Sequence, residues 1–105
     1  NEINAIPQKE TNLIYTAVLG DNARQVAFNL VSLLRSRGYQ VETDFMRRSL
    51  KAQMRDAGKK LAKWVIIIGT DEIQNDKIVL KNMASGEQKE LRLSLAADQI
   101  ETIVK

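Results

Sequence analysis

Two nearly continuous apolar runs constrain the fold of this chain more than any other feature. They are Leu13–Leu19 and Trp64–Ile68. Both are far shorter than the roughly 18–20 residues that a membrane-spanning helix needs. Runs of this length are typical of strands that are covered on both faces of a sheet. The chain is therefore predicted to build layers on both sides of a sheet.

Amphipathic helix patterns lie between and beside these runs. Residues 23–37 repeat apolar side chains with helical spacing, and Gly38 follows as the C-terminal stop. Residues 39–43 alternate as a short strand, and Ser49 is a good N-cap for a second helix. The apolar side of that helix is predicted to carry Leu50, Met54, Ala57 and Leu61. Strand, helix, strand, helix, strand is then complete by residue 69, and such crossovers make right-handed parallel pairs.

The last third of the chain has the pattern of a hairpin. Residues 77–81 and 88–93 alternate around a turn at 84–87, and Ser94 is placed to cap a final helix. The predicted fold class is α/β, with a mixed five-stranded sheet, made of three parallel strands and a hairpin, and three helices. Residues 1–12 are polar, contain the single proline and are predicted to be a linker or tail, so 13–105 form one domain.

The composition excludes much of the chemistry that enzymes use. The chain has no cysteine and no histidine, so thiolate nucleophiles, disulfides, the usual zinc ligands and imidazole acid–base catalysis are absent. Its five glycines are too scattered for a phosphate-binding loop. We assign no catalytic residue, no metal ligand and no cofactor to this chain, and no contact with a membrane.

Positive charge is concentrated in one segment. Between Met46 and Lys63, seven basic residues accompany a single acid, a local charge of +6, whereas the whole chain has a net charge of only +3. The seven are Arg47, Arg48, Lys51, Arg55, Lys59, Lys60 and Lys63. Such side chains neutralise phosphates, and an arginine can pair with a guanine edge. The alternative is a solvated helix side that serves only solubility.

The aromatic residues fall into two groups, candidates for base stacking and residues predicted to pack in the core. Phe45, in the loop before the basic helix, or Tyr39 is a candidate for stacking on an unpaired base. Tyr15, Phe28 and Trp64 fall within apolar patterns and are predicted to pack in the core.

Three segments together carry a family pattern. They are residues 49–54 (Ser-Leu-Lys-Ala-Gln-Met), 65–73 (Val-Ile-Ile-Ile-Gly-Thr-Asp-Glu-Ile) and 79–88 (Val-Leu-Lys-Asn-Met-Ala-Ser-Gly-Glu-Gln). In this combination the chain resembles the C-terminal anticodon-binding domain of bacterial-type histidyl-tRNA synthetases. The glycine-acidic turn also occurs in related class II synthetases, whereas Ser-Leu-Lys-x-Gln and Gly-Glu-Gln favour histidine. The resemblance covers about 13–105 and implies the same mixed sheet with three helices.

The resemblance also implies where RNA would bind. In the relatives, the loop before the second helix, the exposed side of that helix and the glycine-acidic turn approach the anticodon. Carried over by position, the tRNA-binding residues are Arg47, Arg48, Lys51, Arg55, Glu72, Gln74 and Lys81. This chain departs from the family at Leu61 and Lys60, where the relatives usually have glycine and an apolar residue, respectively.

A division of labour within a longer protein follows from the resemblance. This chain would read tRNA identity, while the ATP-dependent attachment of histidine, with its ATP and Mg²⁺, would belong to a preceding catalytic domain. The chain begins at Asn1 without methionine, in keeping with a longer parent. We expect the parent to be a cytoplasmic homodimer and the isolated domain to be a monomer.

Two other functions stay open on the sequence. The same fold occurs in synthetase-like regulatory subunits and polymerase accessory subunits that do not charge tRNA, so a protein-interaction module is one alternative. The other is nonspecific nucleic-acid binding, in which basic side chains contact phosphates without distinguishing bases.

Overall fold

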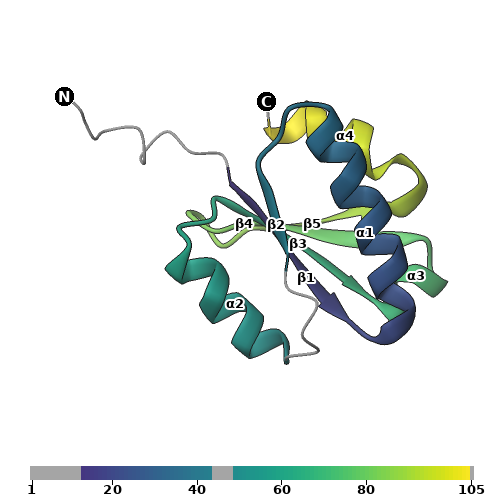
Figure 1. Ribbon diagram of the computed structural model, residues 1–105, viewed down its shortest axis with the longest axis horizontal. Coiled ribbons are helices and arrows are strands. Elements are labelled where there is room, and N and C mark those ends of the chain that lie inside the picture. The colour runs from purple at the N-terminus through teal and green to yellow at the C-terminus, as the bar shows by residue number, and fades with distance from the viewer. Residues whose placement is uncertain (1–12, 44–48, 105) are drawn as a thin grey trace.

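The computed structural model describes residues 13–43 and 49–104 and contains one five-stranded sheet with helices on both faces (Figure 1). Its strands, in the spatial order β2-β1-β3-β4-β5, are β1 (Ile14–Leu19), β2 (Val41–Thr43), β3 (Trp64–Gly69), β4 (Lys77–Asn82) and β5 (Gln88–Arg92). β1 pairs in parallel with β2 and β3, whereas β3, β4 and β5 pair antiparallel. The predicted mixed sheet is confirmed. The predicted tail at 1–12 lies outside the described residues.

Helices cover the two faces of the sheet unequally. On one face lie α1 (Asp21–Ser36), α3 (Thr70–Gln74) and α4 (Ala96–Val104), and on the other lies α2 (Leu50–Lys59) (Figure 1). The three helices predicted from periodicity are α1, α2 and α4. The sequence prediction missed α3, because its five residues are too few for a helical apolar period to show.

Two apolar clusters lie on opposite faces of the sheet. The larger one packs strand residues against α1 and α4; its members include Ile14, Val18, Ile66, Ile68, Ile78, Leu80, Ala27, Leu34 and Ile100. The smaller one lies under α2 and contains Tyr15, Ala17, Ala57, Ala62 and Val65. Because β1 contributes side chains to both clusters, the predicted two-sided burial of this run is confirmed.

Phe28 contradicts the predicted core. Its side chain is 55% exposed on α1, because it falls outside the helical spacing of the residues that face the sheet, Ala23, Ala27, Leu30 and Leu34. Tyr15 is fully buried, and Trp64 is partly buried against the larger cluster. The core prediction is therefore confirmed for Tyr15 and Trp64 and wrong for Phe28.

The start of α4 also differs from the prediction. Ser94 does not cap this helix, since it lies within a 3₁₀ turn, Leu93–Leu95, and α4 begins at Ala96. Instead, the N–H and the hydroxyl of Ser94 donate to the two carboxylate oxygens of Asp76, at 3.2 and 3.3 Å. The serine thus links the turn after β5 to the turn before β4.

An exposed ion cluster joins α4 to the end of α1. Arg37 Nη1 donates to Asp98 at 2.9 Å and to Glu101 at 2.8 Å. These hydrogen bonds, with that to Asp98 the strongest influence, raise the pKa of Arg37 above its ordinary value. The guanidinium thus links the end of α1 to two acidic side chains of α4.

α1 ends with the predicted glycine. The N–H of Tyr39 donates to the C=O of Leu34 at 3.2 Å, and the N–H of Gly38 donates to Arg35 C=O at 3.0 Å. Gly38 has a φ of 95°, a left-handed conformation in which a Cβ is strained. This is the Schellman termination that satisfies the last carbonyls of a helix.

α2 ends in the same motif with a leucine in place of glycine. The N–H of Ala62 donates to Ala57 C=O at 3.0 Å, and the N–H of Leu61 donates to Gly58 C=O at 3.1 Å. Leu61 has a φ of 59° and is 66% exposed. The prediction that Leu61 continues the apolar side of the helix is wrong, because the helix stops at Lys59 and the chain reverses there.

We predict that Leu61→Gly raises the free energy of unfolding by about 0.5–1 kcal/mol. Glycine removes the left-handed strain, which costs roughly 1–2 kcal/mol, and loses part of that gain to its larger unfolded-state entropy. Urea unfolding measures the change. The matched control is Lys59→Gly, in right-handed helix, which should lower stability by about 1 kcal/mol. A loss of stability in Leu61→Gly would contradict the prediction.

Candidate nucleic-acid interface

A buried glutamine fixes α2 to the sheet. β2 pairs with β1 only as far as Thr16 opposite Thr43, so the next backbone groups on that edge, those of Val18, have no strand partner. Gln53 takes the place of a strand there: its Oε1 accepts from Val18 N–H at 2.8 Å, and its Nε2 donates to Val18 C=O at 2.9 Å. Gln53 is only 1% exposed. Sequence analysis placed Gln53 only within the family motif Ser-Leu-Lys-x-Gln and gave it no structural role.

A second contact sets the direction of α2. The hydroxyl of Tyr15 donates to Asp56 at 3.1 Å, one turn of the helix beyond Gln53. Tyr15 lies level with Val65 of β3, whereas Val18 lies level with Ile68. α2 therefore runs antiparallel to β1 and β3, with its N-terminus near the carboxyl end of these strands.

The predicted start of this helix is confirmed. Ser49 is the N-cap, and its hydroxyl accepts from Ala52 N–H at 3.1 Å. The cap follows residues 44–48, which lie outside the described part of the chain. The predicted RNA-binding residues Arg47 and Arg48 and the predicted stacking residue Phe45 fall in that stretch, so their roles stay predictions.

The solvent side of α2 is basic, and two of its cations have no ion-pair partner in the part of the chain that the structure describes. Lys60 pairs with Glu42 at 3.7 Å and with Asp56 at 3.8 Å. Lys51 and Arg55 are exposed and form no ion pair with any residue in 13–43 or 49–104. Unpaired charges of one sign produce a field that attracts an anionic partner.

The predicted glycine-acidic turn lies at the carboxyl end of β3. Gly69 ends the strand, and the carboxylate of Glu72 on α3 occupies the space that a Cβ on Gly69 would fill. Gln74 is exposed at the end of the same short helix. Glycine is thus needed at position 69 so that the carboxylate can lie against the strand. Glu72 shares this edge of the sheet with the N-terminal end of α2.

Lys81 lies at the other end of the sheet. It is paired with Val65, whose side chain packs under α2, so both side chains project from the α2 face. Gly69 is four residues further along β3, and four residues of strand span about 13 Å. The structure therefore brings Lys51 and Glu72 toward one edge and separates Lys81 from them.

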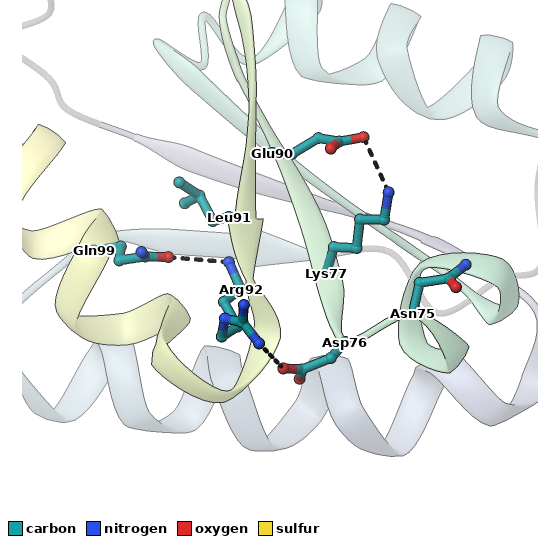
Figure 2. A pocket seen from close by; sticks show the side chains of 7 residues that line it. All are labelled: Asn75, Asp76, Lys77, Glu90, Leu91, Arg92 and Gln99. Atoms are coloured by element: carbon teal, nitrogen blue, oxygen red, sulfur yellow. Dashed lines mark hydrogen bonds and ion pairs between the residues drawn. The ribbon is translucent and has the colours of Figure 1, made fainter.

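A hollow of about 420 Å³ lies beside β5 and was not foreseen (Figure 2). Lys77 pairs with Glu90 at 3.4 Å, and Arg92 pairs with Asp76 at 3.6 Å. The backbone N–H of Arg92 also donates to Gln99 at 3.0 Å. Because the charged groups of the hollow satisfy one another, it lacks the unpaired basic groups found on α2. No sequence spacing marks it, since its residues come from the turn after α3, from β4 and β5, and from α4.

This chain is similar to proteins of a known family. A family model described as an anticodon binding domain matches residues 7–103, nearly the whole chain. The chain belongs to the anticodon-binding domain family. The resemblance found in the sequence is thereby confirmed, and the fold and the basic second helix agree with it.

Individual relatives point to one class of ligase. The chain is 43% identical over 100 residues to the histidine–tRNA ligase of Caldanaerobacter subterraneus subsp. tengcongensis, covering 95% of this chain and 23% of that protein. Apo Staphylococcus aureus histidyl-tRNA synthetase superposes with a TM-score of 0.79 at 33% identity, covering 87% of this chain and 27% of that one. Histidyl-tRNA synthetase from Nostoc sp. PCC 7120 superposes with a TM-score of 0.80 at 29% sequence identity. The match covers 98% of this chain and 25% of that one. These relatives favour the ligase interpretation over the regulatory one.

The chain spans about a quarter of the length of these relatives. Within the described ranges, none of the helices has the length and apolar character needed to cross a bilayer. The same ranges contain no group of three or more acidic, histidine or cysteine side chains that could hold a metal ion.

Gln53→Leu is expected to lower the free energy of unfolding by roughly 2–4 kcal/mol. The substitution keeps the side-chain volume but leaves the N–H and the C=O of Val18 buried without partners, at about 1–3 kcal/mol for each group. Urea unfolding followed by circular dichroism measures this loss. The control is Gln25→Leu, on the exposed side of α1, which should change stability by less than about 0.5 kcal/mol. Equal effects at the two positions would refute the role assigned to Gln53.

Proposed function

We propose that this chain reads the anticodon of a histidine-specific tRNA for a histidine–tRNA ligase. The parent's catalytic domain, outside this chain, would bind ATP and Mg²⁺ and attach histidine. Family membership, the ligase relatives and the basic side of α2 support this function. The parent is expected to be a cytoplasmic homodimer, and the isolated chain a monomer.

One observation carries the proposal. Lys51 and Arg55, which have no ion-pair partner among the described residues, lie on α2, whose N-terminus is near the carboxyl end of the parallel strands, and Glu72 lies at that same end. A carboxylate repels phosphates, so a surface that served only to attract backbone would gain nothing from it. A carboxylate does accept hydrogen bonds from the amino groups of bases. Cations on α2 together with a carboxylate at the same edge of the sheet therefore suit a surface that distinguishes bases.

The residues divide by chemistry. Arg55, with Arg47 and Arg48 outside the described residues, is assigned to guanine edges, because guanidinium groups donate two parallel hydrogen bonds. Lys51 is assigned to phosphates, while Glu72 and Gln74 accept from base amino groups. Anticodon bases must unstack to be read in this way, and Phe45 is the proposed stacking partner. Lys81 is a further tRNA contact.

The first test is fluorescence anisotropy with a histidine-tRNA anticodon stem-loop, anticodon variants of it and an unrelated stem-loop, at two salt concentrations. Preference for the histidine anticodon is the expected result. Equal, strongly salt-sensitive binding to all the RNAs would indicate nonspecific binding through phosphates. Absence of binding to every RNA would favour the protein-interaction alternative.

Glu72→Gln should reduce discrimination between anticodons by about 1–3 kcal/mol, because a base amino group loses its charged acceptor. Binding to the unrelated stem-loop should stay the same or tighten, since a negative charge is removed. Asp71→Asn is the matched control: it makes the same charge change on the neighbouring exposed residue and should preserve discrimination. If both variants discriminate like the unaltered chain, Glu72 does not read a base.

A further inference from the structure

Three lysines from three different elements lie toward the amino end of β3. Lys59 is the last residue of α2, Lys63 precedes β3, and Lys81 lies on β4. The C=O of Lys63 accepts from Met83 N–H at 2.9 Å, which joins the end of the α2–β3 connection to the hairpin. Figure 1 likewise places the C-terminal end of α2 beside the tip of the β4–β5 hairpin. We call Lys59, Lys63 and Lys81 the amino-edge cluster.

The strand register puts these lysines on one side of the sheet. Lys81 is opposite Val65, which packs under α2. Continuing the two-residue alternation of β3 from Val65 places Lys63 on the same face, diagonal to Lys81, and diagonal neighbours lie about 7–8 Å apart. Two lysines whose backbone positions are this close on one face add their positive charges there.

The amino-edge cluster has no acidic partner among the described residues. Lys59, Lys63 and Lys81 form no ion pair within 13–43 or 49–104. The nearby acids Glu42 and Asp56 are paired with Lys60. Elsewhere on the hairpin the lysine is neutralised, as Lys77 is by Glu90. An uncompensated trio of like charges, gathered from three elements, suits an anion with several charges of its own.

We propose that the amino-edge cluster is a second RNA contact, which holds the sugar–phosphate backbone that flanks the anticodon. This inference rests on the proposed function and deepens it by assigning the ligand of Lys59 and Lys63 and the role of Lys81. The cluster lies about 12–13 Å from the Glu72 end, measured along α2 or along β3. A stacked strand carries one charge per roughly 3.4 Å of helix axis and an unstacked strand carries fewer, so that distance spans at most about four phosphates. Contacts this far from the bases that are read position the RNA without distinguishing sequences.

The salt dependence of binding tests the cluster. The double variant Lys59→Gln with Lys63→Gln is compared with the unaltered chain by anisotropy on the histidine stem-loop and its anticodon variants, between about 50 and about 200 mM salt. Each lost phosphate contact should reduce the slope of log affinity against log salt by about 0.7–0.9. Between the two salt concentrations, the factor by which affinity falls should therefore be about ten times smaller for the double variant than for the unaltered chain. Affinity should fall equally for all anticodons, and the ratio between them should not change. Lys81→Gln should act in the same direction by about half as much.

Lys89→Gln is the matched control, since it removes one exposed lysine from the same hairpin on the opposite face of the sheet. It should leave the slope unchanged. Far-UV circular dichroism and urea unfolding check that each variant is folded. An unchanged slope in a folded double variant would overturn the proposal, as would a slope that falls equally with Lys89→Gln.

Neutral backbone linkages locate the contact on the RNA. Stem-loops with methylphosphonates flanking the anticodon should bind the unaltered chain and the double variant with nearly equal affinity, because the phosphate charges that the cluster holds are gone. If the difference between the two proteins persists on such RNA, the cluster does not contact those phosphates. If the unaltered chain shows no preference among anticodons, base reading is refuted. The role of the amino-edge cluster is then decided by the salt dependence of binding alone. No binding by the unaltered chain to any stem-loop would overturn both.

Discussion

The arrangement of this domain depends on the hydrogen bonds between Gln53 and Val18. The central strand β1 is longer than the edge strand β2, so one pair of its backbone groups extends beyond the ladder. The amide of Gln53 supplies both a donor and an acceptor there, at 2.9 and 2.8 Å. A helix held through backbone groups has a fixed height along the strands, unlike one held only by apolar contacts, which are non-directional. The positions of Lys51, Arg55 and Lys59 above the sheet follow from that one side chain.

Hydropathy patterns were sufficient to predict the layers of the fold but not the attachment of α2 to β1 through Gln53. Two-sided burial of β1 and the stripe on α1 follow from side-chain periodicity, and both are present. The role of Gln53 was missed because its burial is explained only by the backbone groups of Val18 that it bonds. Those groups need a partner because of the register between β1 and β2, which the sequence does not show. Leu61 was misplaced for a related reason: the helix period continues through it, while the Schellman bonds that end α2 depend on Ala62 returning to the core.

The candidate site residues came from charge and from the family resemblance, and their roles stay predictions. Counting basic residues pointed to the exposed side of α2, and the resemblance added Glu72 and Lys81. The resemblance grouped Lys81 with the others, because nothing in the alternation of β4 gives its register against β3. That register puts Lys81 opposite Val65 and thus at the far end of the sheet from Gly69. Lys59 and Lys63 acquire a candidate role only once this separation is known.

Unequal coverage of the two faces leaves part of the sheet open to the proposed RNA contacts. β4 alternates between Ile78 and Leu80, buried toward α1 and α4, and Lys77, Val79 and Lys81 on the α2 face. A second helix on that face would require apolar residues in place of Lys77 and Lys81. Since α2 is held above β1 by Gln53, the part of the sheet formed by β4 and β5 keeps charged side chains at its surface. The same attachment that places α2 over β1 therefore leaves Lys81 on the hairpin accessible to the proposed polyanionic partner.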